Sequence, residues 1–178
     1  MKNLNKLLSC LGLTIACFAA VSPLAYANVA GHVQFVNGNV QIVDPAGQTR
    51  PAKKGDAINE GDTLSSAPGS SAQIKMQDGG FVAVRPDTRL KFDQFAFAGK
   101  EDGSEKSFFS LFKGGFRAVT GLIGRINKQN YRITTPAATI GIRGTDHETV
   151  VVTPNGSSVP GGTYNMVNTG ETSMTTDL

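Results

Sequence analysis

The chain has 178 residues, of which 17 % are charged, a length that suits one ordinary domain behind a short N-terminal segment. It holds 17 Lys and Arg against 14 Asp and Glu, so the formal net charge is only +3. The basic residues are scattered along the chain, and this excludes the concentrated basic footprint of a nucleic-acid-binding protein.

The N-terminus has the pattern of a secretory signal. Two lysines precede a mostly apolar stretch over residues 7–21, and an Ala-x-Ala pattern ends at Ala27. This predicts a helical signal peptide over residues 1–27, cleaved after Ala27. The alternatives are an uncleaved anchor, for which the stretch falls short of the ~20 residues that span a bilayer, and lipid attachment at Cys17, where the preceding residues fit poorly.

Cleavage would leave a chain from residue 28 onward that is periplasmic or secreted and has no membrane span. Both cysteines, Cys10 and Cys17, lie in the signal segment. The exported chain therefore has no disulfide framework, thiol nucleophile or cysteine-based metal site, and its stability must come from its own core.

Short strand patterns separated by turns follow. Apolar residues flank Asn37-Gly38, a pair that suits the positive φ angles of a type I′ turn, so residues 33–43 are predicted to form a hairpin. A second hairpin is predicted over residues 72–84, where alternating residues surround Asp78-Gly79-Gly80. Residues 90–97 continue the sheet, and residues 108–112 hold the densest aromatic cluster.

No long window has a helical period. Residues 118–127 are predicted to be a loop with at most one helical turn, because Gly121 and Gly124 each weaken a helix by about 1 kcal/mol relative to Ala. The fold class is therefore all-β. We expect an antiparallel sandwich or jelly-roll-like domain, with a short β-helix-like stack as the alternative.

The segment from residue 130 to residue 152 is the most informative. It alternates like a half-buried strand up to Thr135, stops at Pro136, and resumes with small and branched residues. Gly144 then interrupts it, which predicts a bulge or a close backbone approach. The neighbouring Arg143 is expected to pair with a carboxylate, Asp146 or Glu148, or else to reach water.

The residues TPAATIGIRGT, at positions 135–145, are similar to the signature of the FecR domain, a β-rich domain of bacterial envelope regulators and secreted proteins. Gly55-Asp56, residues 60–64, residues 71–84 and residues 113–117 also resemble motifs of this family, in the same order. The resemblance covers roughly residues 30–152. It implies a FecR-like β domain over residues 28–152.

Residues 153–178 are expected to form a Gly/Thr-rich loop and a terminal hairpin. Its strands would be residues 163–167 and 172–176, joined by Asn168-Thr169-Gly170. Family members often continue beyond such a point, so a chain that stops at Leu178 is either a shortened version or a truncated form. The last strand would present an unpaired edge.

No catalytic, cofactor-binding or metal-binding residue is predicted. His147 lies between Asp146 and Glu148, but on a strand it faces the opposite side from both, so the three cannot converge on a metal without a bend. The sequence has neither a nucleophile elbow nor a phosphate loop. The residues expected to serve the architecture first, and interaction second, are Thr135, Pro136, Arg143, Gly144 and Thr145.

The resemblance implies an exported binding or sensing module that acts through contact with an envelope protein or polymer, and not an enzyme. The founding members of the family place a cytoplasmic anti-sigma segment and one membrane helix before the periplasmic domain. A cleavable signal replaces both here, so direct anti-sigma activity is not expected. The alternative is an enzyme that acts on envelope polysaccharide, or an accessory carbohydrate-binding protein, supported by compartment and fold alone.

Overall fold

The computed structural model describes residues 28–99, 102–154 and 159–176, so the predicted signal peptide lies outside the described residues. Within these residues twelve strands form one sheet, and the helical content is one short helix and one 3-10 turn, which confirms the all-β class. The elements are β1 (Val29–Asn37), β2 (Val40–Val43), β3 (Thr49–Pro51), β4 (Ala57–Asn59), β5 (Thr63–Ser66), β6 (Ser71–Met76), β7 (Phe81–Val84), β8 (Arg89–Ala96), β9 (Lys106–Val119), α1 (Leu122–Ile126), η1 (Lys128–Asn130), β10 (Tyr131–Thr134), β11 (Thr139–Val152) and β12 (Gly162–Thr175).

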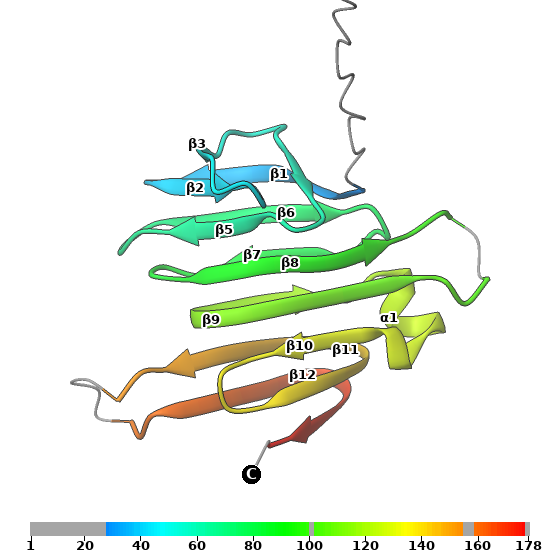
Figure 1. Ribbon diagram of the computed structural model, residues 1–178. Helices are drawn as coiled ribbons and strands as arrows, with labels where there is room; N and C mark the ends of the chain where they lie inside the picture. The colour runs from blue at the N-terminus through cyan, green and yellow to red at the C-terminus, as the bar shows by residue number, and fades with distance from the viewer. Residues whose placement is uncertain (1–27, 100–101, 155–158, 177–178) are drawn as a thin grey trace, which may run out of the picture.

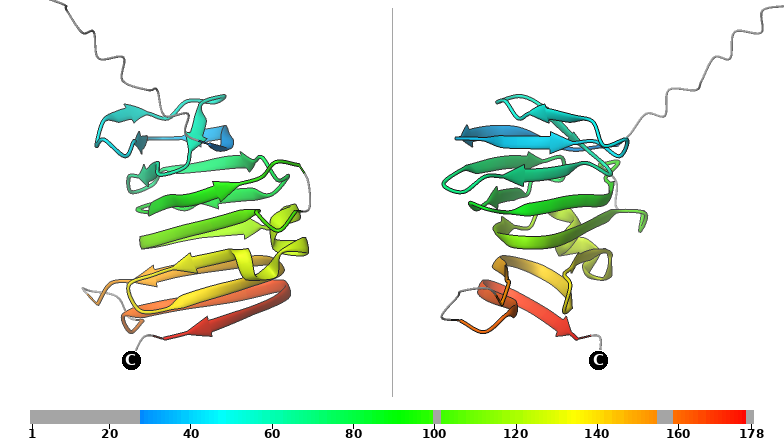
Figure 2. Two further views of the ribbon diagram at one scale, coloured as in Figure 1. Left: turned by 45° about the vertical axis from the view of Figure 1, so that its right-hand side comes forward. Right: turned by 60° about the vertical axis from the view of Figure 1, so that its left-hand side comes forward.

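The sheet curls into two facing layers, so the expected sandwich takes the form of a stack whose layers are parts of one sheet (Figure 1). The long strand β9 joins them: its first half pairs with β8 and β10, and its second half pairs with β7 and β11. Every pairing is antiparallel except that of β9 with β10. The chain progresses along the stack from one end to the other, as the colours of Figures 1 and 2 show.

The core lies between the two layers. Phe109 is at its centre, with its ring centroid 5.3 Å from that of Phe92, 6.2 Å from that of Phe116 and 5.6 Å from that of Tyr131. All four rings are buried. The predicted aromatic cluster thus fills the interior through alternate residues of β9, while Phe108 and Phe112 of the same strand face outward.

The predicted hairpin at Asp78-Gly79-Gly80 is confirmed, because β6 pairs with β7 from Ala72 opposite Val84 to Lys75 opposite Phe81. The predicted hairpin at Asn37-Gly38 is wrong. β1 pairs with β4 and β6, whereas β2 pairs with β3 and β5. The apolar faces of both strands meet the interlayer core, so this turn carries the chain from one layer to the other.

The predicted terminal hairpin is also wrong. Residues 162–175 form one strand, β12, which pairs antiparallel with β11 along its length. Asn168-Thr169-Gly170 lies opposite the irregular part of β11, between Arg143 and His147, so the two strands bend together there and no turn forms. The expected helical turn is present as α1. In the described part of the chain, no helix has the length and hydropathy that a membrane crossing requires.

Candidate functional site

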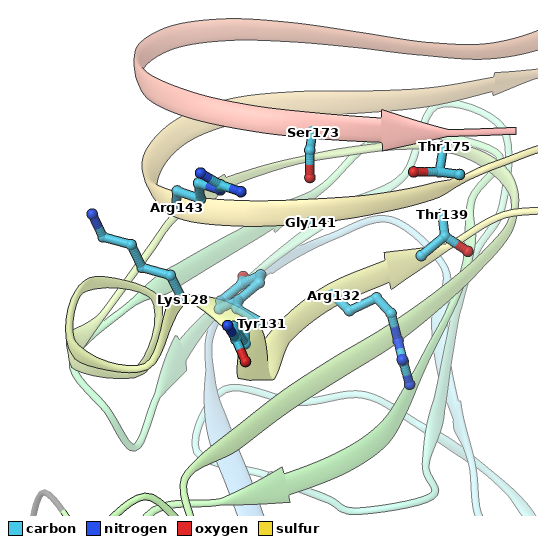
Figure 3. Close-up of a pocket in the computed structure, with 9 residues that line it drawn as sticks. Lys128, Tyr131, Arg132, Thr139, Gly141, Arg143, Ser173 and Thr175 are labelled. Carbon is cyan, nitrogen blue, oxygen red and sulfur yellow. The ribbon is translucent and has the colours of Figure 1, made fainter.

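A groove of about 500 Å³ crosses the outer face of the last three strands of the stack (Figure 3). It is bounded by η1 on one side and by β12 on the other. Basic and hydroxyl-bearing side chains predominate among its lining residues, which are Lys128, Gln129, Tyr131, Arg132, Thr139, Gly141, Arg143, Ser173 and Thr175.

The floor of the groove is formed by strand register. Arg132 of β10 lies opposite Gly141 of β11, and Gly141 lies opposite Ser173 of β12, so the three residues form one row across the sheet. A Cβ atom at Gly141 would lie 2.7 Å from the Ser173 hydroxyl oxygen. Glycine in the middle of the row therefore leaves open the space between the arginine and the serine.

The groove is positively charged. Lys128 and Arg143 both border its end nearest to η1, whereas the Arg132 guanidinium extends toward β9 and lies 4.3 Å from the centroid of the Phe108 ring. As far as the structure describes the chain, the groove lining includes no carboxylate, and the Arg143 guanidinium lies 3.9 Å from the Glu171 carboxylate. Among the described residues, neither Lys128 nor Arg132 has a carboxylate within 4.0 Å. Such a surface supplies several donors to an anionic group.

Tyr131 connects the groove to the core. Its side chain is buried against Phe109 beneath the groove, and burial raises the pKa of its phenol. The ring therefore stays neutral at physiological pH and adds no charge to the site. The position of the groove wall thus depends on the packing of the interlayer core.

Two of the predicted signature residues, Thr135 and Pro136, form the tight turn between β10 and β11. The Thr135 hydroxyl accepts a hydrogen bond from the Ala138 backbone N–H at 3.0 Å and donates to the Ala138 carbonyl at 2.9 Å. The Thr135 backbone N–H also donates to that carbonyl at 2.9 Å. The turn fixes the register of β10 against β11, and so it aligns Arg132 with Gly141.

The other three signature residues lie at a bulge in β11. Gly144 has a φ of +70°, a conformation that favours glycine, and the register with β12 shifts between Arg143 and Asp146. The Thr145 backbone N–H donates to the Thr120 hydroxyl at 2.9 Å, and the Thr120 N–H donates to the Thr145 carbonyl at 2.9 Å. The bulge predicted from Gly144 is therefore confirmed, and its backbone is tied to the end of β9.

Arg143 does not pair with Asp146 or Glu148, so that expectation was wrong. Asp146 accepts two hydrogen bonds from Arg117, at 2.9 and 2.6 Å, and these lower the pKa of its carboxyl group, while Glu148 pairs with Arg85. Arg143 continues the alternation of Thr139 and Gly141 and points into the groove, whereas both acids lie beyond the bulge. Its side chain is 50 % exposed, so the guanidinium reaches water, which was the alternative expected from the sequence.

His147 faces the core, opposite in direction to its two acidic neighbours, as the strand alternation predicted. Its ring is fully buried, edge-on to Phe116 with centroids 5.9 Å apart. Burial lowers the pKa of His147 to about 4. Within the described residues, no group of three His, Cys, Asp or Glu side chains could hold a metal ion.

Comparison with known proteins identifies the family of the chain. The family described as "FecR protein" matches residues 62–171, which is more than half of the sequence. The chain belongs to the FecR family. No curated protein matches this FecR chain. One solved structure, a "Cell surface anchoring domain", is similar to it with 30 % sequence identity and a TM-score of 0.35. The match covers 36 % of this chain and 84 % of the other chain.

FecR domains are associated with the bacterial envelope and act in signalling, and the match includes the whole signature from Thr135 to Thr145. Reasoning from the sequence missed the other lining residues of the groove, among them Lys128, Arg132, Gly141 and the hydroxyls of β12. The alternation of β10 did place Arg132 outward. Its alignment with Gly141 and Ser173 depends on two strand pairings, and the sequence marks neither of them.

We expect Gly144→Ala to lower the free energy of unfolding of this FecR chain by about 1–2 kcal/mol, because a non-glycine residue is strained at this positive φ. Space is not the reason, since an added Cβ would have no heavy atom closer than 3.5 Å. Arg143→Ala should change the unfolding free energy by about 0.5 kcal/mol or less, because its side chain is half exposed. Urea denaturation of both variants measures this difference. A larger loss for Arg143→Ala would show that the arginine is structural.

Proposed function

We propose that this FecR-family chain is an exported binding and sensing module of the bacterial envelope, which holds an acidic partner and does not transform a substrate. The family supports the envelope and signalling parts of the proposal. The signal-peptide pattern of residues 1–27 supports export to the periplasm or beyond.

The observation that carries the proposal is the basic groove. Lys128 and Arg143 can both direct charged donors at one ligand group, and the hydroxyls of Thr139, Ser173 and Thr175 add neutral hydrogen-bonding positions. Carboxylate and phosphate groups are the ligands that such a set of donors recognises. Both an acidic segment of an envelope protein and an acidic polymer carry these groups.

Binding fits the site better than hydrolysis. Glycoside hydrolysis generally needs two carboxyl groups on either side of the scissile bond. The two acids nearest to the signature, Asp146 and Glu148, each pair with an arginine and lie outside the groove lining. We therefore favour a binding module over a polysaccharide-acting enzyme.

We expect the double substitution Lys128→Gln/Arg143→Gln to weaken binding of an acidic polymer about 100-fold, because a hydrogen bond to a charged group contributes about 1.5–3 kcal/mol. Poly-L-glutamate and polygalacturonate serve as the probes, one a polypeptide and the other a polysaccharide. Isothermal titration calorimetry at two salt concentrations measures the affinity. Binding to the unaltered chain should weaken as salt rises.

The matched control is Arg89→Gln/Lys113→Gln, which removes the same charge from neighbouring positions of β8 and β9 outside the groove. Binding by this control should stay within about twofold of the unaltered chain, since exposed charges act weakly at a distance. Gly141→Val is a second test, because its side chain fills the floor and leaves every charge in place. Equal losses in the groove variant and the control would contradict a specific site, and unimpaired binding by Gly141→Val would place binding outside the groove.

A further inference from the structure

The two ends of the strand stack are built differently. At the first end, residues 52–56 fold over β1 and β2. The Ala52 N–H donates to the Val40 carbonyl at 2.8 Å, the Gly55 N–H donates to the Val33 carbonyl at 2.7 Å, and the Val33 N–H donates to the Asp56 carbonyl at 2.9 Å. The two edge strands there, β3 and β4, have three residues each. This end is capped, as the ends of strand stacks usually are.

In the part of the chain that the structure describes, the other end has no such protection. It is formed by β12, which has 14 residues and pairs only with β11 among the described residues. The strand contains no lysine, arginine or proline, and Glu171 is its single charged residue. Natural proteins usually protect a long edge with such residues or by covering it. The edge of β12 is therefore available for pairing with a further strand.

The interlayer core also remains open at β12. Val167 lies opposite His147, and Met174 lies opposite Ile140, so both apolar side chains point between the layers beside fully buried neighbours. Val167 is nevertheless 38 % exposed and Met174 is 43 % exposed.

A polar residue on the same side of β12 also indicates that this edge pairs with a further strand. Asn165 lies opposite the buried Thr149, and both its amide nitrogen and its amide oxygen are buried without a hydrogen-bond partner among the described residues. An amide left in this state is costly. It would gain partners from one more strand next to β12.

We infer that β12 is the contact between two copies of this chain, paired antiparallel about a two-fold axis through the bend at Asn168-Thr169-Gly170. In such a pairing the first half of one β12 lies beside the second half of the other, and the two stacks join end to end. Residues that point between the layers then meet residues of the second copy that also point between the layers. The resulting pairs are Thr163 with Met174, Asn165 with Thr172, and Val167 with Gly170.

This register answers each open feature of the edge. Asn165 lies opposite Thr172 of the second copy, and its amide reaches that hydroxyl once the side chain turns toward the edge. Val167 and Met174 are covered by the opposing strand. Glu171 falls opposite Met166 of the second copy, so the two glutamates do not face each other. A second copy is favoured over an unrelated strand because the one sequence matches both sides of the contact, as a two-fold interface requires.

The pairing has a consequence for the basic groove. Ser173 lines the groove, and in this register Tyr164 of the second copy lies beside it on the outer face. The second copy therefore adds an aromatic side chain to the groove wall of the first. The contact itself rests on the β12 edge and does not depend on what the groove binds.

Cysteine cross-linking tests the register, using the chain expressed for export. The double variant Asn165→Cys/Thr172→Cys should form a disulfide-linked dimer under mild oxidation, seen as a band of doubled mass without reductant. Directly opposite residues of antiparallel strands have Cα atoms about 4.5–5.5 Å apart, within the range that a disulfide spans. Each single variant should remain unlinked, because residues 165 and 172 face each other and not themselves.

The matched control is Asn165→Cys/Ser173→Cys, in which one cysteine moves to the opposite face of the sheet and loses its partner. Thr163→Cys/Met174→Cys is a second pair in the expected register, and it keeps the test decisive where one double variant fails to fold. Sedimentation of the chain without introduced cysteines should show a dimer, and Val167→Lys/Met174→Lys should convert it to a monomer. The inference is overturned if the unaltered chain sediments as a monomer, or if the two in-register pairs cross-link no better than the shifted control.

Discussion

Replacing Phe109 by alanine lowers the free energy of unfolding by about 3–5 kcal/mol, the largest loss that we expect from a single substitution. Phe109 is 2 % exposed and touches three other buried rings, those of Phe92, Phe116 and Tyr131. Alanine would leave a cavity where the two layers meet, at the strand that joins them. Urea denaturation followed by circular dichroism measures the change.

Phe112→Ala is the matched control, because Phe112 lies on the same strand but is 46 % exposed. We expect it to cost about 1 kcal/mol or less, since little apolar area is withdrawn from the core. Similar losses for the two variants would contradict the position of the core between the layers. Phe109→Ala should also weaken acidic-polymer binding, because Tyr131 rests on Phe109 beneath the groove.

The sequence predicted those parts of the fold that depend on near neighbours. The hairpin of β6 and β7 is local: its alternating strands, its Asp-Gly turn and its register all lie within residues 71–84. Asn37-Gly38 carries an equally strong turn signal, but a turn does not specify which strands pair. Val36 pairs with Ala72, far along the chain, because the curled sheet buries β1 and β2 in opposite layers.

Only the local features of the site were predicted from the sequence. The signature from Thr135 to Thr145 marked a break in the strand pattern at Pro136 and a bulge, both of which are local backbone features, and both are present. The predicted partner of Arg143 was wrong because both acids lie beyond the bulge, on the part of β11 that pairs with β9, where Arg117 and Arg85 bind them. The groove was missed because it needs β10, β11 and β12 in register, and the last of these was expected to be a hairpin.

His147 should make the fold sensitive to mild acid. Burial lowers the pKa of this histidine to about 4 in the folded chain, whereas an unfolded histidine titrates near 6.5. The unfolded chain therefore binds more protons between these two values. The stability due to neutral His147 is complete above pH 6.5 and is lost progressively as the pH falls toward 4. At about 1.4 kcal/mol for each pKa unit, the loss is about 3 kcal/mol.

His147→Leu places an apolar side chain of similar volume at this position and removes the titrating group. We expect its unfolding free energy to fall by about 3 kcal/mol less than that of the unaltered chain between pH 7 and pH 4. His32→Leu is the control, because His32 is exposed on β1, and its pH profile should run parallel to that of the unaltered chain. The Asp146–Arg117 ion pair is present in all three chains, so its own acid sensitivity is largely removed by the comparison. If His147→Leu keeps the full acid sensitivity, then other groups are responsible for it, and the interior around Phe116 admits water to the imidazole.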